Sequence, residues 1–314
     1  MNHNPTIDIL LATYNGGRYL AEQIQSLLDQ TYTRWRLIIR DDGSLDDTLS
    51  VIHQYRGKYP DKITLIEDGE GNLGPCRNFA RLLEHADADY TMFCDQDDVW
   101  LPTKIALTLE KMSELIAKYG KDVPLLVYTE MKVVDENLSL ISDSYWKHQA
   151  FNPESGRRLN RLLVGNVIIG CTMMFNRTLR ELSLPFPREA LMHDWWLGLV
   201  AVVLGKSDYL QEPTTYYRQH KSNVVGANWH LTIPAVMVLA FSLRKHKDHL
   251  LRTQEQAAAL AERYGHLLNK MDLEKVLVYS QLKDQNCIKK RYFILKYHFL
   301  WAGYLRSTAM FVLI

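Results

Sequence analysis

The first part of the chain alternates between two patterns of apolar and polar positions. Short, largely apolar runs predict buried strands, and between them apolar residues recur at helical spacing, as Leu20, Ile24 and Leu27 do. The predicted strands cover residues 7–13, 34–40, 63–67 and 90–94. The predicted helices cover residues 19–30, 44–55 and 74–85, and Ser44 with Asp47 resembles an N-capping arrangement for the second. This alternation predicts an α/β fold with a mostly parallel central sheet flanked by helices.

The pattern changes in the second part of the chain. The remaining predicted elements are two strands and a buried helix, at residues 125–134, 167–175 and 193–204. Residues 135–160 are polar, aromatic and irregular, which is typical of a loop that faces a substrate. From about residue 229 onward the spacing is almost wholly helical. We therefore expect one domain over residues 1–226 and a helical C-terminal region over residues 227–314.

The composition argues against several classes of protein. With 37 Lys and Arg against 36 Asp and Glu, the net charge of +1 gives no general electrostatic basis for binding nucleic acid. No apolar stretch reaches the roughly 20 residues that span a bilayer. The first residues lack the basic and apolar parts of a secretion signal, and the four cysteines form no Cys-x-x-Cys pair. We therefore expect a cytoplasmic protein with reduced thiols.

Four polar residues, Asp95-Gln96-Asp97-Asp98, directly follow the fourth predicted strand. Carboxylates this close repel one another unless protons or a cation intervene, and a hard divalent ion prefers oxygen ligands. The carboxyl ends of strands are also where open α/β sheets bind ligands. The tetrad therefore predicts a metal-diphosphate site. The alternative is a solvated loop that leads into a helix, which Pro102 favours.

Polar segments also follow other predicted strands or precede predicted helices. They are Thr13-Tyr14-Asn15-Gly16, Arg40-Asp41-Asp42-Gly43-Ser44, Asn72-Leu73-Gly74-Pro75-Cys76-Arg77-Asn78 and Leu191-Met192-His193-Asp194-Trp195-Trp196. Each segment is weak evidence by itself, because an Asp-Asp-Gly-Ser segment is usually a turn that caps the next helix. The tight turn at Asn15-Gly16-Gly17 has the same ordinary explanation.

In their order along the chain, these segments resemble the family 2 glycosyltransferases with the GT-A fold. The shared pattern is a strand ending in Thr-Tyr-Asn, a strand ending in Asp-Asp-Gly-Ser, a Gly-Pro-x-Arg-Asn helix start, and then Asp-Gln-Asp-Asp-x-Trp. The likeness covers residues 5 to 226. Two further segments, residues 193–196 and 217–220, are similar to those of bacterial rhamnosyltransferase-like members. Processive members carry a Gln-x-x-Arg-Trp segment and several membrane spans instead, which this sequence does not show.

The resemblance implies a nucleotide-binding half in residues 1–100 and an acceptor-binding half in residues 101–226. It implies an inverting transfer of one sugar, with L-rhamnose as the candidate, from a dTDP- or UDP-sugar donor to a saccharide acceptor. A role in cell-surface polysaccharide synthesis follows from the same likeness.

A divalent cation, Mn²⁺ or Mg²⁺, is expected because it would stabilise the negative charge that grows on the diphosphate as the glycosidic bond breaks. Asp97 is the first candidate ligand, and Asp95 is placed on the metal or on the donor's ribose. His220 is a third candidate, since imidazole suits Mn²⁺ better than Mg²⁺. The alternative for His220 is an ordinary surface histidine. Arg218 beside it would face the diphosphate.

The resemblance also implies a pocket for the nucleotide. It places the contacts to the donor's base and ribose at Thr13, Tyr14, Asn15, Asp41 and Asp42. Arg77 would pair with a donor phosphate or hold Asp95. The alternative for Arg77 is a surface ion pair worth under about 1 kcal/mol.

The reaction needs a base for the acceptor hydroxyl, on the side of the sugar opposite the leaving group. Asp194 is the candidate, because its apolar neighbours would raise its pKa and make it a better base. The alternative is that Asp194 is the N-cap of the helix predicted at residues 193–204. Trp195 and Trp196 are expected to contact the acceptor.

The tail at residues 286–314 has basic and aromatic residues and no acidic one. Its basic residues are Lys289, Lys290, Arg291, Lys296 and Arg306. Such a segment is typical of a helix that lies on an anionic membrane, at about 1 kcal/mol for each well-placed basic residue. We therefore expect a peripheral protein on the inner face of the cell membrane, with a lipid-linked acceptor. The alternative is a helix that packs on the domain or on a second copy in a homodimer.

Other enzyme classes fit the sequence less well. A sugar-phosphate nucleotidylyltransferase would need a Gly-rich basic loop after the first strand, where this chain has Ala12-Thr13-Tyr14-Asn15. A haloacid-type phosphatase would carry Asp-x-Asp after its first strand, and an NAD enzyme its Gly-x-Gly-x-x-Gly. A carbohydrate- or membrane-binding protein that kept the fold without turnover stays open.

Overall fold

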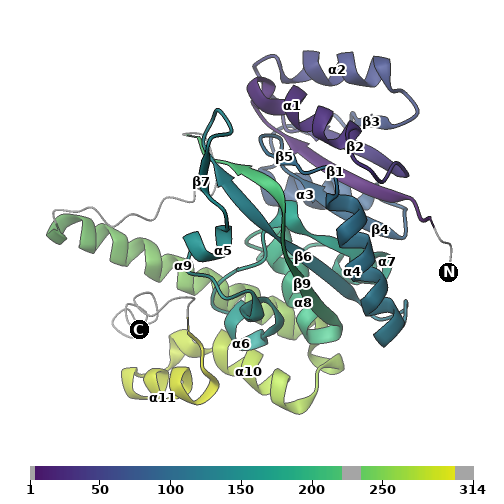
Figure 1. The fold of residues 1–314 in the computed structure, drawn as a ribbon. Helices are drawn as coiled ribbons and strands as arrows, with labels where there is room; N and C mark the ends of the chain where they lie inside the picture. The colour runs from purple at the N-terminus through teal and green to yellow at the C-terminus, as the bar shows by residue number, and fades with distance from the viewer. Residues whose placement is uncertain (1–3, 221–234, 301–314) are drawn as a thin grey trace.

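Strand β1 (Ile7–Thr13) lies near the middle of a mixed sheet that has helices on both faces (Figure 1). The computed structural model describes residues 4–220 and 235–300. Side chains alternate along a strand, so Ile9 and Leu11 enter one hydrophobic core and Leu10 enters another. Because both faces of β1 are apolar, both must be covered by helices.

The other strands complete a nine-stranded sheet in the described part of the chain. They are β2 (Trp35–Asp41), β3 (Ile63–Ile66), β4 (Tyr90–Cys94), β5 (Val99–Trp100), β6 (Leu125–Val134), β7 (Leu140–Ser142), β8 (Met174–Asn176) and β9 (Lys206–Arg218). The order is β3-β2-β1-β4-β8-β6-β9-β5, with β7 beside β6. The first four run parallel, β8 is antiparallel to both of its neighbours, and β9 is parallel to β6. The predicted α/β fold with a mostly parallel sheet is confirmed.

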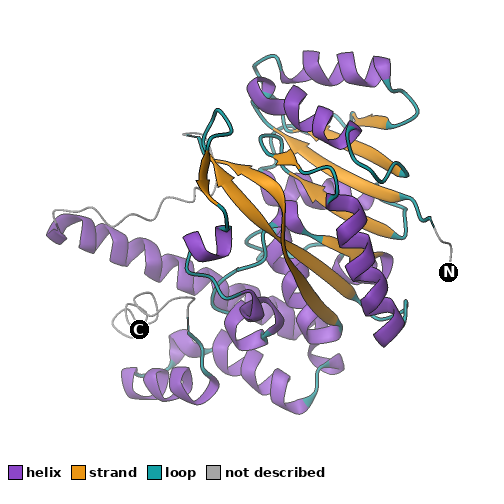
Figure 2. Cartoon of the chain, viewed as in Figure 1, coloured by secondary structure: helices purple, strands orange, loops and turns teal. Residues whose placement is uncertain are grey.

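Helices form a layer on each face of the sheet (Figure 2). One layer contains α1 (Gly17–Leu28), α2 (Thr48–Lys58) and α4 (Lys104–Tyr119), which contribute Ile24, Ile52 and Met112 to the core around Ile9. The other contains α3 (Pro75–Glu84), α7 (Arg177–Ser183) and α8 (His193–Leu204). Short helices α5 (Tyr145–His148), η1 (Pro153–Arg157), α6 (Leu159–Leu162) and η2 (Gly170–Thr172) connect β7 to β8.

The C-terminal part is helical in its described residues, as predicted. It consists of α9 (Ala235–Tyr264), η3 (Gly265–Leu267), α10 (Lys270–Ser280), η4 (Leu282–Asp284) and α11 (Cys287–Tyr297). These helices share the core of α8: the Gln256 side chain accepts a hydrogen bond from the Leu191 backbone at 2.8 Å, and Tyr264 packs near Trp196. The predicted boundary at residues 226/227 lies outside the described residues. Among the described helices, none has both the length and the apolar character needed to cross a bilayer.

Two local predictions are wrong, and one strand was missed. Residues 167–175 form a strand only at their end, because η2 interrupts the apolar run before β8. The long strand β9 was not predicted, because its polar residues and Pro213 weaken the alternation and its pairing with β6 shifts register near that proline. The cap of α2 is Asp47, which makes no side-chain capping bond, and Asp46 instead accepts from the backbone of Thr48 at 3.0 Å.

The segment at residues 135–160 is more ordered than a loop. The buried Glu130 carboxylate accepts hydrogen bonds from the backbone of Tyr145 at 3.1 Å and of Trp146 at 3.3 Å, at the start of α5. Both aromatic side chains are buried in the core. This part of the segment is therefore packed on the sheet, whereas an irregular loop facing a substrate was predicted.

Candidate functional site

The parallel strands β1, β2 and β4 end at the same edge of the sheet. Thr13 is in register with Asp41, and Leu11 with Cys94. The loops that follow these strands therefore meet. This edge, at the carboxyl ends of parallel strands, is where open α/β sheets bind ligands.

Asp41 joins the loops that follow β1 and β2. One carboxylate oxygen accepts from the Thr13 hydroxyl at 2.8 Å and from the Ser44 hydroxyl at 2.6 Å. The other accepts from the backbone N–H of Ser44 at 2.8 Å and of Gly43 at 3.1 Å. Asn15, at a left-handed φ of 48°, donates its N–H to the Ser44 hydroxyl at 2.8 Å. Three of the predicted donor-binding residues are thus brought together.

Gln96 fixes the loop of the Asp tetrad to the loop after β1. Its side-chain amide accepts from the Tyr14 N–H at 2.8 Å and donates to the Tyr14 carbonyl at 3.0 Å. A Cβ atom on Gly16 would lie 2.2 Å from the Gln96 side-chain oxygen, so a larger residue there would displace the Gln96 amide. The Tyr14 side chain remains 48% exposed, which leaves its ring accessible to a ligand.

Asp42 has a different place from the one predicted. Its carboxylate is buried and accepts from the Arg40 guanidinium at 2.9 Å. It also accepts from the backbone of Leu73 and of Gly74, each at 2.8 Å. With hydrogen bonds to both of its oxygens, Asp42 holds the start of α3. Its predicted contact with the nucleotide stays a prediction, and the burial of its carboxylate counts against it.

Asp97 and His220, predicted as ligands of one cation, lie together. The His220 Nε2 atom is 2.8 Å from an Asp97 carboxylate oxygen, and both side chains are mostly buried. The His220 ring also lies 4.9 Å from the Tyr19 ring, measured between centroids. His220 is therefore not an ordinary surface histidine.

Arg218 is also placed differently from the prediction. Its guanidinium is buried, pairs with the Glu22 carboxylate, and lies over the Tyr19 ring. It donates to the backbone carbonyls of Asp97 at 2.8 Å and of Glu136 at 2.7 Å. Arg218 therefore fastens the tetrad loop to α1, and in this structure its donors point at protein acceptors in place of a diphosphate.

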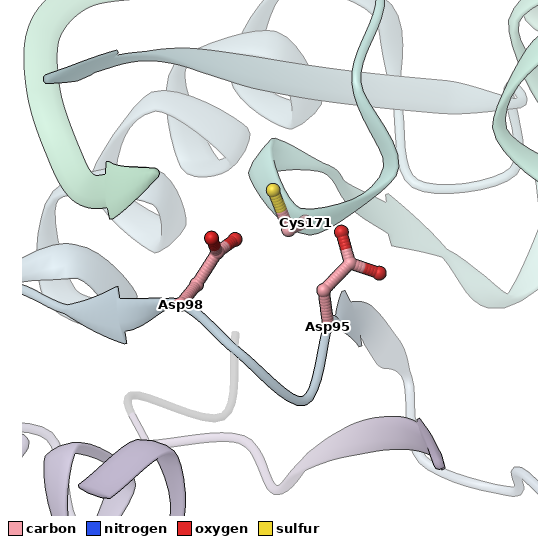
Figure 3. Close-up of side chains that lie close together, drawn as sticks. All are labelled: Asp95, Asp98 and Cys171. Atoms are coloured by element: carbon pink, nitrogen blue, oxygen red, sulfur yellow. The ribbon is translucent and has the colours of Figure 1, made fainter. Parts of the chain in front are cut away.

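A group of possible ligand atoms comes from Asp95, Asp98 and Cys171, whose side chains face one another (Figure 3). These atoms lie within 4.8 Å of one another. Burial, with the charges of Asp97 and Asp194, raises the pKa of Asp95 to about 7. One Asp98 oxygen accepts from the Arg218 backbone N–H at 3.1 Å, and the other has no hydrogen-bond partner among the described residues.

This arrangement fits a hard divalent cation. The unpartnered Asp98 oxygen and the mutual repulsion of the carboxylates are both relieved by a cation, whose preferred ligands are oxygen atoms. Burial raises the pKa of the Cys171 thiol well above its ordinary value, so a neutral thiol is a poor ligand beside the carboxylates. Asp98 was not predicted as a site residue, although it belongs to the same tetrad.

Asp194 lies in the first turn of α8 and is buried. Its carboxylate accepts from the Gly170 N–H at 3.0 Å and from the Trp195 N–H at 2.6 Å. Burial raises its pKa to about 7, against the opposing effect of these hydrogen bonds. The N-cap of α8 is Met192, so the alternative that Asp194 is the cap is wrong.

The start of α3 faces the same region. Cys76 is close enough to Asp194 for that carboxylate to help burial raise the pKa of its thiol to about 12. The neighbouring Arg77 is exposed. Its side chain forms no hydrogen bond or ion pair with another residue in the described part of the chain, Asp95 included. Arg77 is therefore available to an anionic ligand, and the alternative of a surface ion pair is not found.

Trp195 and Trp196 do not line an open site. Trp195 is buried and donates its ring N–H to the Leu162 carbonyl at 2.6 Å. Trp196 is fully buried and donates to the Ser183 carbonyl at 3.1 Å. Both anchor α8, which is apolar on all sides. Their predicted contact with the acceptor stays a prediction, and their burial counts against it.

Lys104 was also absent from the sequence prediction. It is fully buried at the start of α4, and burial lowers its pKa to about 8, while Asp98 and Asp95 oppose that change. A lysine two residues after a proline at a helix start looks like an ordinary solvated residue. Only its burial beside the tetrad marks it as part of the site.

Comparison with known proteins gives a family. The model of the family described as "Glycosyl transferase family 2" matches residues 8–182. The dTDP-rhamnosyl transferase RfbG of Shigella flexneri is 28% identical over 229 residues, which are 69% of this chain and 74% of RfbG. The poly(ribitol-phosphate) beta-N-acetylglucosaminyltransferase TarS of Staphylococcus aureus is 34% identical over 120 residues, 38% of this chain and 20% of TarS.

Solved structures share the fold. The crystal structure of S. aureus TarS 1-349 in complex with UDP-GlcNAc has a TM-score of 0.52 at 17% identity, covering 88% of this chain and 80% of that one. The mannosyltransferase PcManGT from Pyrobaculum calidifontis, in complex with GDP-Man and Mn²⁺, has a TM-score of 0.54 at 16% identity, covering 99% of this chain and 84% of that one. At these identities the likeness establishes the fold.

Proposed function

Because this chain belongs to glycosyl transferase family 2, we propose that it moves a sugar, with inversion, from a nucleoside-diphosphate donor to a saccharide acceptor. The observation that carries the proposal is the meeting of the tetrad carboxylates with Asp194 at the carboxyl edge of the sheet. Asp194 is near enough to contribute to the raised pKa of Asp95, so the two groups can act on one substrate.

A divalent cation, Mn²⁺ or Mg²⁺, would supply positive charge to the leaving diphosphate at this edge. Asp95 and Asp97 are proposed to hold it, with His220 beside Asp97. The Asp98 oxygen that lacks a partner supports a cation at the same place. Asp98 itself would remain bound to the Arg218 backbone and would orient the loop.

The donor is proposed to bind over the loops after β1 and β2. Tyr14 has the exposed ring that can stack on a base, and Asn15 and Thr13 shape the pocket through Asp41. Arg77 lies exposed at the start of α3, where its guanidinium can pair with a donor phosphate. Arg77 is therefore proposed as the donor-binding cation in place of Arg218.

Asp194 is proposed as the base. Its carboxylate would accept the proton of the acceptor hydroxyl as that oxygen bonds to the anomeric carbon. The bond from this carbon to the diphosphate breaks, and the electron pair leaves on the diphosphate oxygen. The two backbone N–H donors hold the carboxylate in one orientation, and its raised pKa makes it a stronger base than an ordinary aspartate.

L-Rhamnose from a dTDP-sugar is the proposed donor, which the likeness to RfbG supports. The proposed acceptor is a lipid-linked saccharide in cell-surface polysaccharide synthesis, met at an anionic membrane surface. On α11, the exposed residues Ile288, Tyr292 and Leu295 share one face and have Lys289 and Lys296 beside them, which supports contact with such a surface.

The test is hydrolysis of nucleotide sugars without acceptor, screened over dTDP-, UDP- and GDP-sugars with Mn²⁺, with Mg²⁺ and with chelator. We expect metal-dependent release of the nucleoside diphosphate from one class of donor. Binding of a nucleotide sugar without turnover, with or without an acceptor, would favour the non-catalytic alternative. Release of pyrophosphate from a nucleoside triphosphate and a sugar phosphate would favour a nucleotidylyltransferase.

A further inference from the structure

Lys104 is a fully buried cation in the middle of the molecule. Its ammonium donates to the Cys171 carbonyl at 2.8 Å, to the Thr215 hydroxyl at 2.6 Å and to the Thr214 hydroxyl at 3.3 Å. It also lies 4.5 Å from the centre of the Trp100 ring. All three of its hydrogens are therefore satisfied, by the sheet strand β9 on one side and by η2 on the other.

The bond to Cys171 connects Lys104 with the proposed base. Cys171 lies in the middle of η2, and the preceding residue, Gly170, donates its N–H to Asp194 at 3.0 Å. A Cβ atom on Gly170 would lie 2.6 Å from the His193 ring, so this loop packs closely on α8. The position of the Gly170 N–H, and hence the orientation of the Asp194 carboxylate, depends on where η2 is held.

Cys171 also lies against the tetrad, because its thiol and the carboxylates of Asp95 and Asp98 gather together (Figure 3). No ion pair joins Lys104 to either carboxylate in the described part of the chain. Lys104 thus lies between Asp194 and the tetrad carboxylates and forms no bond with either.

We propose that Lys104 is a positioning residue of the transferase: through the Cys171 carbonyl it holds η2, so that the Gly170 N–H fixes Asp194. The role in transfer rests on the proposed function. The hold on η2 does not, because it is a property of the protein by itself.

A lysine that only stabilised the core would lower stability when replaced and would leave the site unchanged in the folded molecules. A positioning lysine has two further effects. Its loss frees the Gly170 amide, and it lowers kcat more than it raises the KM for the donor, because the base is disturbed and the nucleotide pocket is not.

The experiment compares Lys104→Met, Thr215→Val and Thr108→Val in the full chain. Thr215→Val removes the hydroxyl that accepts the shortest hydrogen bond from Lys104 and keeps the ammonium. Thr108→Val is the matched control, because Thr108 is equally buried on α4 and donates only to the Lys104 backbone carbonyl, at 2.7 Å. Amide hydrogen exchange at Gly170 is measured in each variant, together with kcat and KM for the donor under saturating Mn²⁺.

We expect the Gly170 amide to exchange ~5-fold faster or more in Lys104→Met, with a smaller effect in Thr215→Val and none in Thr108→Val. We expect kcat to fall ~10- to 100-fold in Lys104→Met, with a KM for the donor within about threefold of the parent. If Lys104→Met does not fold, Thr215→Val decides by the same two measurements.

Exchange at Gly170 that matches the Thr108→Val control in the other variants would overturn the inference. So would a change in KM with kcat unaltered. If the parent protein turned over no nucleotide sugar, the proposed function would fail while the exchange at Gly170 still decided whether Lys104 holds η2.

Discussion

Asp97 and Asp194 are held in different ways, and their environments support the different roles proposed for them. Asp97 lies beside His220 in the tetrad loop, where a cation would neutralise the carboxylates. The Asp194 carboxylate, in the first turn of α8, accepts hydrogen bonds from two backbone N–H groups in an apolar setting. A change at each residue therefore removes a separate part of the proposed reaction.

We predict that Asp194→Asn lowers sugar transfer by ~10²- to 10⁴-fold, because the amide cannot accept the acceptor's proton. Binding of the nucleoside diphosphate with Mn²⁺ should stay near normal, since the tetrad is untouched. Asp97→Ala should abolish donor binding and metal-dependent turnover together. Calorimetric binding of the nucleoside diphosphate and a transfer assay separate the two. Transfer by Asp194→Asn at the parental rate would refute the assignment of the base.

At the scale of elements, Arg40 joins the loops at the proposed nucleotide-binding edge. From β2 it reaches Asp42 at 2.9 Å and Asp68, after β3, at 2.9 and 3.1 Å. Asp68 also accepts from Arg81 of α3 at 3.3 Å. The hydrogen bonds from Arg40 hold the pKa of Asp68 at about 2, below its ordinary value of 3.8. This network positions the start of α3, and with it Arg77.

We predict that Asp68→Asn lowers the free energy of unfolding by about 1–3 kcal/mol at neutral pH. Because the folded-state pKa is depressed, the contribution of Asp68 is present above about pH 3.8 and is lost as the pH falls through about 2. Denaturant unfolding of parent and variant over this range should therefore converge at low pH. Glu67→Gln is the control, since Glu67 pairs with Arg56 at 3.5 Å on the exposed surface. An equal loss in the control would contradict the role of Asp68.

At the scale of the whole molecule, the C-terminal helices are fastened to the sheet domain. The guanidinium of Arg263 donates to the carbonyl groups of Leu182 at 3.0 Å and of Ser183 at 3.4 Å, at the end of α7. Thr253 of α9 bonds Tyr279 of α10 at 2.8 Å. The Tyr297 hydroxyl of α11 donates to the Glu274 carboxylate of α10, and Ile294 of α11 is buried in the same core as α10. Its opposite face stays exposed, which sets where a membrane surface could meet the enzyme.

We predict that Ile288→Asp weakens binding to anionic vesicles ~10-fold or more, because the 81% exposed side chain would enter the lipid interface. Leu140→Asp is the matched control, since Leu140 is 61% exposed on β7. Flotation with vesicles of anionic and of neutral lipid measures both. Equal flotation of parent and Ile288→Asp would count against α11, and gel filtration of the parent would then test the homodimer.

The sequence predicted the elements whose signals are local. β1, β2 and β4 are largely apolar runs, and α8 is apolar on all sides, so each could be recognised without its neighbours. β9 could not, because most of its residues are polar and its stability comes from pairing with β6, which is far away in the sequence. The interruption of the strand predicted at residues 167–175 likewise depends on the contact of η2 with Asp194.

The order of the motifs, through its resemblance to the family 2 glycosyltransferases, indicated the family without any structure, and the family model confirms it. The strand pattern also placed the Asp tetrad at the end of a parallel strand, because parallel strands bring their carboxyl ends to one edge. The tertiary structure alone decided which side chains remain accessible there. It buried Asp42 against Arg40, turned Arg218 toward the tetrad backbone, and placed Trp195 and Trp196 in the core. It also brought Lys104 beside Cys171. Burial and hydrogen-bond partners depend on distant segments, and a motif does not contain them.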